Sequence, residues 1–435
     1  MAIIVNDRLS TRAALPPPEQ LSVLDILTGH YCFSGVYYLR KKPNVELIKA
    51  SLQSALDQNP AVSSSLKRGG NSFWLNCENV GVSFTVVYSD ADSAPSPDSA
   101  AITEGSELID PEPQLSDVLY HAQPLHYFRL TLFKQAGATL GVKHVHSFAD
   151  GRCMAKFMEQ WAAIYNGTSI WTENSSVSRA DITALGSQLC KYPSTRFSHA
   201  PADFDVLSAL KKQAPLFGSV RKSLPKEYLT ILLERCRHQS DINVSSSDVI
   251  HALLWKAFAQ CSDHRDDESC SIFSIFDLRG ASNLNIPVDF FGNAVIERYA
   301  ELPFSQVRRE PIYRLAEIYR TAIKPILENE IRQDIGYLNE ELKNGHIDSS
   351  SGTFSHFSRR SLRACTEGTG IYLNDMRFLG TNNIEFDGEP AVYDLRVHMG
   401  YHHAAVHALD DSHIAIRYTG LSKTLSHFFD ELSAY

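Results

Sequence analysis

The chain has 435 residues, of which 43% are hydrophobic and 21% are charged, values typical of a folded protein rather than a disordered or fibrous one. Its 41 Lys and Arg against 50 Asp and Glu give a formal net charge of −9, which excludes the overall basic charge typical of nucleic-acid binding. Charges or prolines interrupt every apolar run well short of the roughly 18 residues of a membrane-spanning helix. A chain of this length predicts two or three domains.

The first half alternates helical and extended patterns. Residues 43–58 have apolar side chains at helical spacing, and residues 74–88 read as a strand. Residues 90–117, rich in Ser, Pro and acidic residues, are expected to form a surface loop. Residues 126–146 predict two strands around a Gln-Ala-Gly-Ala turn, and an amphipathic helix is expected from Asp150 onward.

The second half repeats this mixture. Residues 245–248, Ser-Ser-Ser-Asp, are typical of a capping box at the start of a helix. Residues 270–280 predict a strand that ends in Asp-Leu-Arg, and residues 308–345 predict helical structure. The C-terminal part predicts a hairpin of two strands over 402–420 and then a final helix.

The stretch between the two halves lacks sustained periodicity over residues 166–214 and is a candidate linker. We therefore expect an α/β protein with an N-terminal domain over residues 1–185, a crossover linker over 186–214 and a C-terminal domain over 215–435.

The search for chemistry begins with what is missing: GxSxG, GxxxxGK[ST], GxGxxG and HExxH do not occur. The sequence does contain His146-Ser-Phe-Ala-Asp150-Gly151. An HxxxD pattern also starts at His199 and at His407, so the pattern alone is weak, and a lone one more often marks a structural histidine. Only the first stands where an apolar strand ends and an amphipathic helix begins. Such a corner can place an imidazole in a cleft with a carboxylate one turn away.

This segment resembles the HxxxDG motif of BAHD-type acyltransferases, which belong to the superfamily of chloramphenicol acetyltransferase and nonribosomal-peptide condensation domains. Segments in four other places agree in family order. They are 21–25 (LSVLD), 246–255 (SSDVIHALLW), 277–280 (DLRG) with 289–294 (DFFGNA), and 373–378 (LNDMRF). The resemblance spans nearly the whole chain. It implies two chloramphenicol-acetyltransferase-like domains, each a mixed sheet with helices, with the active-site channel at their interface.

Two departures from the family pattern stand out. The best match to the family's DFGWG motif is residues 385–390, EFDGEP, which lacks the tryptophan. Condensation domains have two adjacent histidines, whereas Val145 here separates His144 from His146. The second departure argues against peptide-bond formation.

The candidate site residues follow from this chemistry. Acyl transfer to an alcohol needs a base near neutral pH, and His146 is the candidate because imidazole has a suitable pKa. The resemblance implies that Asp150 forms a salt bridge with Arg279 rather than acting as a second base. Gly151 would let the substrate approach His146, and the amide of Asn374 would stabilise the tetrahedral oxyanion. It is equally open that Asn374 is only a turn residue at the end of a strand.

The acyl donor is expected to be acyl-CoA as a co-substrate, with no tightly bound cofactor. Its phosphates need cations, and the basic residues between 211 and 226 are the candidates, above all Arg221 and Lys222, together with Ser246. A solvated charged face explains such a cluster equally simply. The histidines between 398 and 407 lack a complete set of metal ligands, so we expect no metal.

The sequence thus predicts a monomeric, cytoplasmic O-acyltransferase that transfers an acyl group from acyl-CoA to a hydroxyl of a small molecule, in a ternary complex and without a covalent intermediate. Cys153 has no evident partner that would activate it. No nucleic-acid or membrane partner is expected. The alternatives are a condensation-type enzyme that uses a carrier-protein thioester, and a repurposed cleft that binds or cyclises a polyketide or terpenoid.

Overall fold

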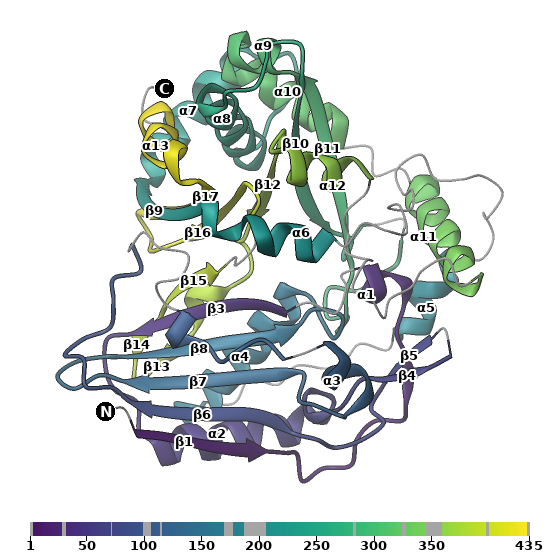
Figure 1. The fold of residues 1–435 in the computed structure, drawn as a ribbon, viewed down its shortest axis with the longest axis vertical. Helices are drawn as coiled ribbons and strands as arrows, with labels where there is room; N and C mark the ends of the chain where they lie inside the picture. The colour runs from purple at the N-terminus through teal and green to yellow at the C-terminus, as the bar shows by residue number, and fades with distance from the viewer. Residues whose placement is uncertain are drawn as a thin grey trace.

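The computed structural model contains two α/β halves, one above the other in Figure 1, as the sequence predicts. It describes residues 3–27, 32–70, 72–98, 106–113, 115–168, 177–186, 206–281, 284–323, 328–344, 359–396 and 400–432. Each half is built on a six-stranded mixed sheet.

The N-terminal half forms the lower sheet of Figure 1. Its strands are, in spatial order, β1 (Ile3–Leu9), β6 (Val82–Tyr88), β7 (His126–Leu132), β8 (Ala138–Val145), β3 (Cys32–Leu39) and β15 (Val392–Arg396). Apolar side chains of α2 (Val45–Gln58) and α4 (Gly151–Tyr165) pack with this sheet into a single core around Trp161. The expected hairpin of β7 and β8 and both helices are therefore confirmed.

Two expectations for this half need correction. Residues 74–88 do not form one strand, because a turn with positive φ at Asn76 and Gly81 separates β5 (Ser72–Leu75) from β6. β5 joins β2 (Glu19–Gln20) and β4 (Lys67–Gly69) in a separate small sheet. The expected surface loop over 90–117 contains η2 (Ser106–Leu108) and α3 (Leu115–Tyr120), and Leu108 and Ile109 are buried against the sheet.

The C-terminal half forms the upper sheet, covered on its outer face by helices (Figure 1). Its strands are, in spatial order, β11 (Val295–Pro303), β10 (Ser269–Asp277), β12 (Gly370–Asp375), β16 (His403–Ala408), β17 (His413–Leu421) and β9 (Phe217–Pro225). Its helices are α7 (Lys226–Gln239), α8 (Ser246–Cys261), α9 (Phe304–Arg309), α10 (Ile312–Ile323) and α13 (Leu425–Leu432). Ser245 and Asp248 form the predicted capping box at the start of α8.

Smaller elements connect the two halves. A third apolar cluster joins α1 (Val23–Leu27), α5 (Arg179–Ala184) and α11 (Glu328–Lys343) at the side of the molecule (Figure 1). On the inner side of the upper sheet, α6 (Val206–Gln213) packs against α12 (Arg359–Glu367). Four short 3-10 turns complete the described chain: η1 (Pro60–Ser63), η3 (Ala214–Leu216), η5 (Thr381–Asn383) and η6 (Ser422–Thr424).

One segment departs from the expected domain division. β15 lies within residues 215–435 but pairs antiparallel with β3, so the C-terminal half contributes an edge strand to the N-terminal sheet. The hairpin of β13 (Glu385–Phe386) and β14 (Glu389–Pro390) falls at the degenerate DFGWG-like segment 385–390. It packs the Phe386 ring with its centre 5.9 Å from that of Trp161 on α4. Within the expected linker, residues 187–205 lie outside the described part of the chain.

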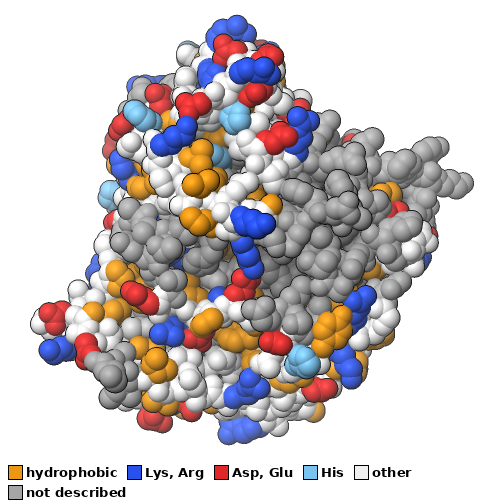
Figure 2. Space-filling model, in the orientation of Figure 1, with side chains coloured by type: hydrophobic (Ala, Val, Ile, Leu, Met, Phe, Trp, Pro, Cys, Tyr) orange, Lys and Arg blue, Asp and Glu red, His pale blue; other side chains and the backbone are white. Residues whose placement is uncertain are grey.

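The surface carries no marked segregation of charge on the face drawn in Figure 2, where Lys and Arg side chains alternate with Asp and Glu side chains. None of the helices in the described ranges has the length and apolar character needed to cross a bilayer.

Candidate active site

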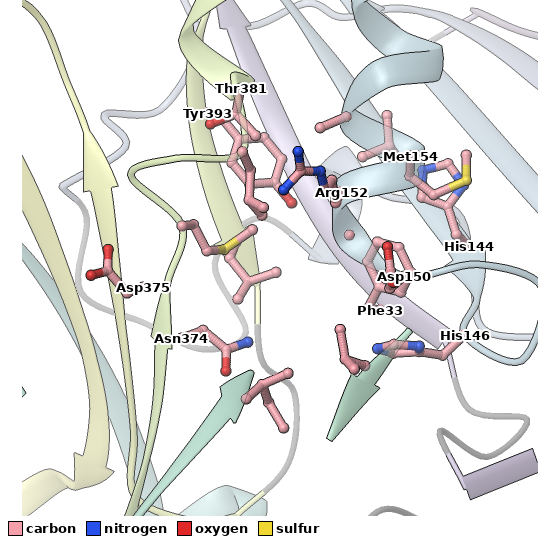
Figure 3. Close-up of a pocket in the computed structure, with 18 of the residues that line it drawn as sticks. Phe33, His144, His146, Asp150, Arg152, Met154, Asn374, Asp375, Thr381 and Tyr393 are labelled. Atoms are coloured by element: carbon pink, nitrogen blue, oxygen red, sulfur yellow. The ribbon is translucent and has the colours of Figure 1, made fainter. Parts of the chain in front are cut away.

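A cavity of about 210 Å³ lies at the interface of the two halves. The N-terminal half contributes residues on β3, on β8 and at the start of α4, and the C-terminal half contributes residues on β10, β12 and β16. In Figure 3, His146 and Asn374 lie on opposite walls of this cavity. Its lining includes Phe33, Tyr37, Val142, His144, His146, Asp150, Gly151, Met154, Met158, Ile275, Tyr372, Asn374, Tyr393, Leu395 and His403. The expected channel between the domains is thus present.

His146 lies at the corner between β8 and α4, and side chains from other segments hydrogen-bond to the backbone of this corner. The side-chain amide of Asn293 donates to the carbonyl of His146 at 2.9 Å. Nη2 of Arg179 donates to the carbonyl of Phe148 at 2.7 Å. The His146 ring makes an edge contact with the Phe33 ring, with 4.9 Å between centroids. The imidazole is therefore fixed at the wall of the cavity.

Asp150 is the N-cap of α4, where its Oδ1 accepts from the backbone N–H of Cys153 at 3.2 Å. Its Oδ2 lies 2.8 Å from Nη2 of Arg279 and accepts from the backbone N–H of Ala294 at 3.1 Å. The two charged side chains are 3% and 1% exposed. The ion pair that the resemblance implies is therefore formed, and both oxygens of Asp150 are occupied by it and the helix cap.

A second buried carboxylate supports the same corner and was not singled out by the sequence. Asp25, fully buried, accepts from Arg179 Nη1 at 2.7 Å and from the backbone and side chain of Asn293 at 2.9 and 3.0 Å. Asn293 and Arg179 also hydrogen-bond to the backbone of the His146–Asp150 loop. Asp25 therefore orients that loop indirectly, through these two residues. Asp25 belongs to the LSVLD segment and Asn293 to the FGNA segment, and both segments were noted in the sequence. No sequence pattern, however, links the two segments to each other.

Burial sets the proton affinities at the site. It lowers the pKa of His146 below the ordinary value of a histidine, and the Asp150 carboxylate only partly opposes this. The ring is thus neutral, and able to accept a proton, at pH 7. Burial also raises the pKa of Cys153 to about 12, with Asp150 adding to the effect. Cys153 is therefore a protonated thiol that packs beside Arg279, not an activated nucleophile.

Two further predicted residues line the cavity. Asn374 on β12 has an amide oxygen that is buried without a hydrogen-bond partner in the described part of the chain. A Cβ on Gly151 would lie 3.7 Å from the Cδ1 of Leu379, an ordinary contact distance. Packing alone therefore does not require glycine at 151, and its effect is to leave space in the cavity next to His146.

The predicted donor-binding residues are not brought together. Arg221 and Lys222 are neighbours on β9, so their side chains point to opposite faces of the sheet. Arg221 is 4% exposed and faces the N-terminal half, where its Nη1 lies 2.9 Å from Asp98. Lys222 is exposed, with its ammonium 5.0 Å from the centre of the Phe429 ring on α13. Ser246 is the first residue of α8 and is not among the residues that line the cavity.

The histidines near the C-terminus do not assemble a metal site among the described residues, which contain no suitable group of three or more His, Cys, Asp or Glu. His402 hydrogen-bonds to the Tyr418 hydroxyl at 2.8 Å, and the ring of His407 contacts that of Tyr393. His398 and the pattern that starts at His199 lie outside the described residues.

Comparisons with known proteins agree with this geometry. The family model described as the Transferase family matches residues 3–359. The acyltransferase GLAUCE of Arabidopsis thaliana is 24% identical over 358 residues, which cover 77% of this chain and 76% of that protein. The crystal structure of vinorine synthase has a TM-score of 0.71 at 14% identity and covers 98% of this chain and 96% of that one. The F. graminearum protein TRI101, complexed with ethyl coenzyme A, has a TM-score of 0.71 at 15% identity, covering 100% and 98%.

The chain has a two-domain fold of the chloramphenicol-acetyltransferase type, with the HxxxDG corner at the domain interface. Within that class, the chain belongs to the Transferase family, the BAHD acyltransferases. The resemblance found in the sequence and the assignment as an acyl-transferring enzyme are confirmed.

Proposed function

We propose that this enzyme transfers an acyl group from acyl-CoA to a hydroxyl of a small-molecule acceptor, with His146 as the general base. The observation that carries the proposal is the position of His146, a neutral imidazole fixed at the wall of an interdomain cavity opposite Asn374. Asp150 is unavailable as a second base, because its carboxylate is committed to Arg279 and to the cap of α4.

The reaction needs no covalent enzyme intermediate. His146 removes the hydroxyl proton as the acceptor oxygen attacks the thioester carbonyl. A tetrahedral oxyanion forms, and the amide N–H of Asn374 stabilises it. When the carbon–sulfur bond breaks, the CoA thiolate takes the proton back from the His146 imidazolium. The products are the ester and free CoA thiol, and the enzyme returns to its starting state.

The relatives support the choice of donor. TRI101 of F. graminearum has been crystallised with coenzyme A and T-2 mycotoxin, and also with coenzyme A and deoxynivalenol. In this chain the phosphates of the donor require a cation, and Arg221 is the better placed of the two candidates because it faces the N-terminal half. Asp98 has to release Arg221 before a phosphate can bind there.

A screen of alcohols with short-chain acyl-CoA tests the proposal. The purified enzyme is incubated with acyl-CoA and each alcohol, thiol release is followed with a chromogenic disulfide, and ester formation is followed by mass spectrometry. We expect saturable, acceptor-dependent thiol release that His146→Ala abolishes. Activity with a carrier-bound thioester but with no acyl-CoA would instead support condensation-type chemistry. Binding of ligands with no transfer from any thioester would support a repurposed cleft.

A further inference from the structure

Two further histidines, one of which lines the cavity, form a pair that takes no part in the proposed reaction. His126 on β7 and His144 on β8 are paired residues of the antiparallel ladder. Their Nδ1 atoms are 2.9 Å apart, and their side chains are 0% and 1% exposed. A polar contact this deep in the apolar core of the N-terminal half fixes both rings.

The protonation of this pair follows from its surroundings. Burial lowers the pKa of His144 to about 3 and that of His126 well below the ordinary value, so both rings are neutral at pH 7. Two neutral imidazoles that share a bond between Nδ1 atoms must be different tautomers, because one Nδ1 donates and the other accepts. The tautomer of His126 therefore determines that of His144.

The environment of His126 selects between the two arrangements. Its Nε2 is buried and has no hydrogen-bond partner among the described residues. A proton at that position would be a buried N–H without an acceptor, which is rarer in proteins than a buried lone pair without a donor. The proton of His126 therefore lies on Nδ1 and is donated to Nδ1 of His144. His144 is left with its own proton on Nε2.

That Nε2–H of His144 is the polar group of an otherwise apolar part of the cavity. His144 lines the cavity together with Val142, Met154 and Met158, and Figure 3 shows it next to Met154. Nδ1 is engaged with His126, and Nε2 has no hydrogen-bond partner in the described part of the chain, so Nε2 is the nitrogen available to a ligand.

We propose that His144 binds substrate by donating its Nε2–H to an acceptor oxygen, and that His126 is the positioning residue that holds this tautomer. The ligand would carry a carbonyl, ether or phenolic oxygen on an apolar framework that packs against Met154 and Met158. This inference rests on the proposed function in one respect: the oxygen belongs either to the acceptor molecule or to the acyl chain. A ligand of the same shape without the oxygen leaves the N–H unpaired and binds more weakly.

The tautomer can be measured without any ligand. Histidine-labelled enzyme, with ¹⁵N in both ring positions, is examined by long-range proton–nitrogen correlation, and the His144 signals are assigned by their loss in His144→Phe. We expect the protonated nitrogen of His144 to be Nε2 in the wild type. In His126→Phe, which removes the donor, the preference should be lost and both tautomers should appear. A wild-type His144 that carries its proton on Nδ1 overturns the proposal.

Ligand recognition is tested with a matched pair of probes. Acetophenone carries a carbonyl oxygen, and ethylbenzene has nearly the same shape without one. Titrations should show that the wild type prefers acetophenone by about fivefold, the value of one net hydrogen bond, and that His144→Phe loses this preference while it still binds ethylbenzene. His403→Phe is the control, because His403 lies in the same cavity and has no hydrogen-bonded histidine partner among the described residues. Equal affinities in the wild type, or an equal loss of preference in the control, overturns the proposal.

These readouts need no turnover, so they are independent of the proposed function. His146→Ala should keep both the tautomer and the preference for acetophenone even though it abolishes transfer. With active enzyme, the source of the oxygen is then assigned. If it belongs to the acceptor, His144→Phe raises the KM for oxygen-bearing alcohols relative to simple ones. If it belongs to the acyl chain, the KM changes for oxygen-bearing acyl-CoA donors instead.

Discussion

Separating Asp150 from Arg279 tests how the HxxxDG corner is held. Asp150→Asn keeps an oxygen that can accept from the Cys153 N–H, so α4 retains its cap while the carboxylate charge is lost. The Arg279 guanidinium, 1% exposed, then faces a neutral amide in place of Asp150 but keeps its ion pair with Asp277 at 2.9 Å. Arg279→Met removes the cation and leaves Asp150 buried without it. Arg279→Met leaves Asp150 uncompensated, for which the expected loss is about 3–5 kcal/mol of unfolding free energy. Asp150→Asn should lose less, because Asp277 still compensates the charge of Arg279.

The double variant decides whether the two residues act as partners. Independent effects of the two single changes would add, but the double variant leaves no buried charge uncompensated. We expect its loss to be smaller than the sum by about 2–3 kcal/mol, at the upper end of the coupling between contacting residues. Urea unfolding of all four proteins, followed by tryptophan fluorescence, gives these values.

The control is the exposed pair Lys343–Glu340, whose side chains are 69% and 44% exposed although their charged atoms are 2.7 Å apart. Its coupling should stay within about 0.5 kcal/mol, as for exposed helical pairs. If the losses of Asp150→Asn and Arg279→Met simply add, the ion pair contributes nothing specific and the reasoning about the corner fails.

Four further results are expected. His146→Ala should lower kcat by at least about a hundredfold without changing the urea midpoint, whereas His407→Ala, at a chance HxxxD pattern, should keep transfer activity; a folded His146→Ala enzyme with near wild-type kcat would refute the assignment. Because burial lowers the pKa of His146, the base is lost only as the pH falls through that value, so log(kcat/KM) should rise with pH and level off below pH 6.5; a limb centred above pH 7 would contradict this. Arg221→Gln should raise the KM for acyl-CoA more than it lowers kcat, and Lys222→Gln should change neither; the reverse pattern would place the phosphates on the other face of β9. Dialysis against EDTA should leave activity intact, and a loss that zinc restores would reveal a metal site.

The sequence predicted the elements that local patterns encode. The hairpin of β7 and β8, the start of α4 at Asp150 and the capping box of α8 each depend on residues a few positions apart, and all were found as expected. The ion pair of Asp150 with Arg279 joins residues 129 positions apart (279 − 150). Only the resemblance to a family could suggest it, since no periodicity connects such distant positions.

What could not be predicted depends on the pairing of distant segments. β15 reads as an ordinary strand of the C-terminal half, yet it completes the N-terminal sheet next to β3. Asp25 stood out in the sequence only as part of the segment 21–25, and its role emerges only when Arg179 and Asn293 reach it from two other segments. Hydrogen bonds between distant strands, or between buried side chains of different segments, do not affect the spacing of residue types within one segment. They therefore cannot be predicted from that spacing.

The candidate phosphate ligands show the same limit within a single strand. Adjacent basic residues in a sequence suggest a common anion site, which holds in a flexible loop or at the start of a helix. Residues 221 and 222 lie instead in the middle of β9, where successive side chains point to opposite faces. Arg221 turns toward Asp98 and Asp394, and Lys222 turns toward the helices of the C-terminal half. Lys222 therefore points away from the N-terminal half, and the proposal of Arg221 as the phosphate ligand follows from strand geometry rather than from charge.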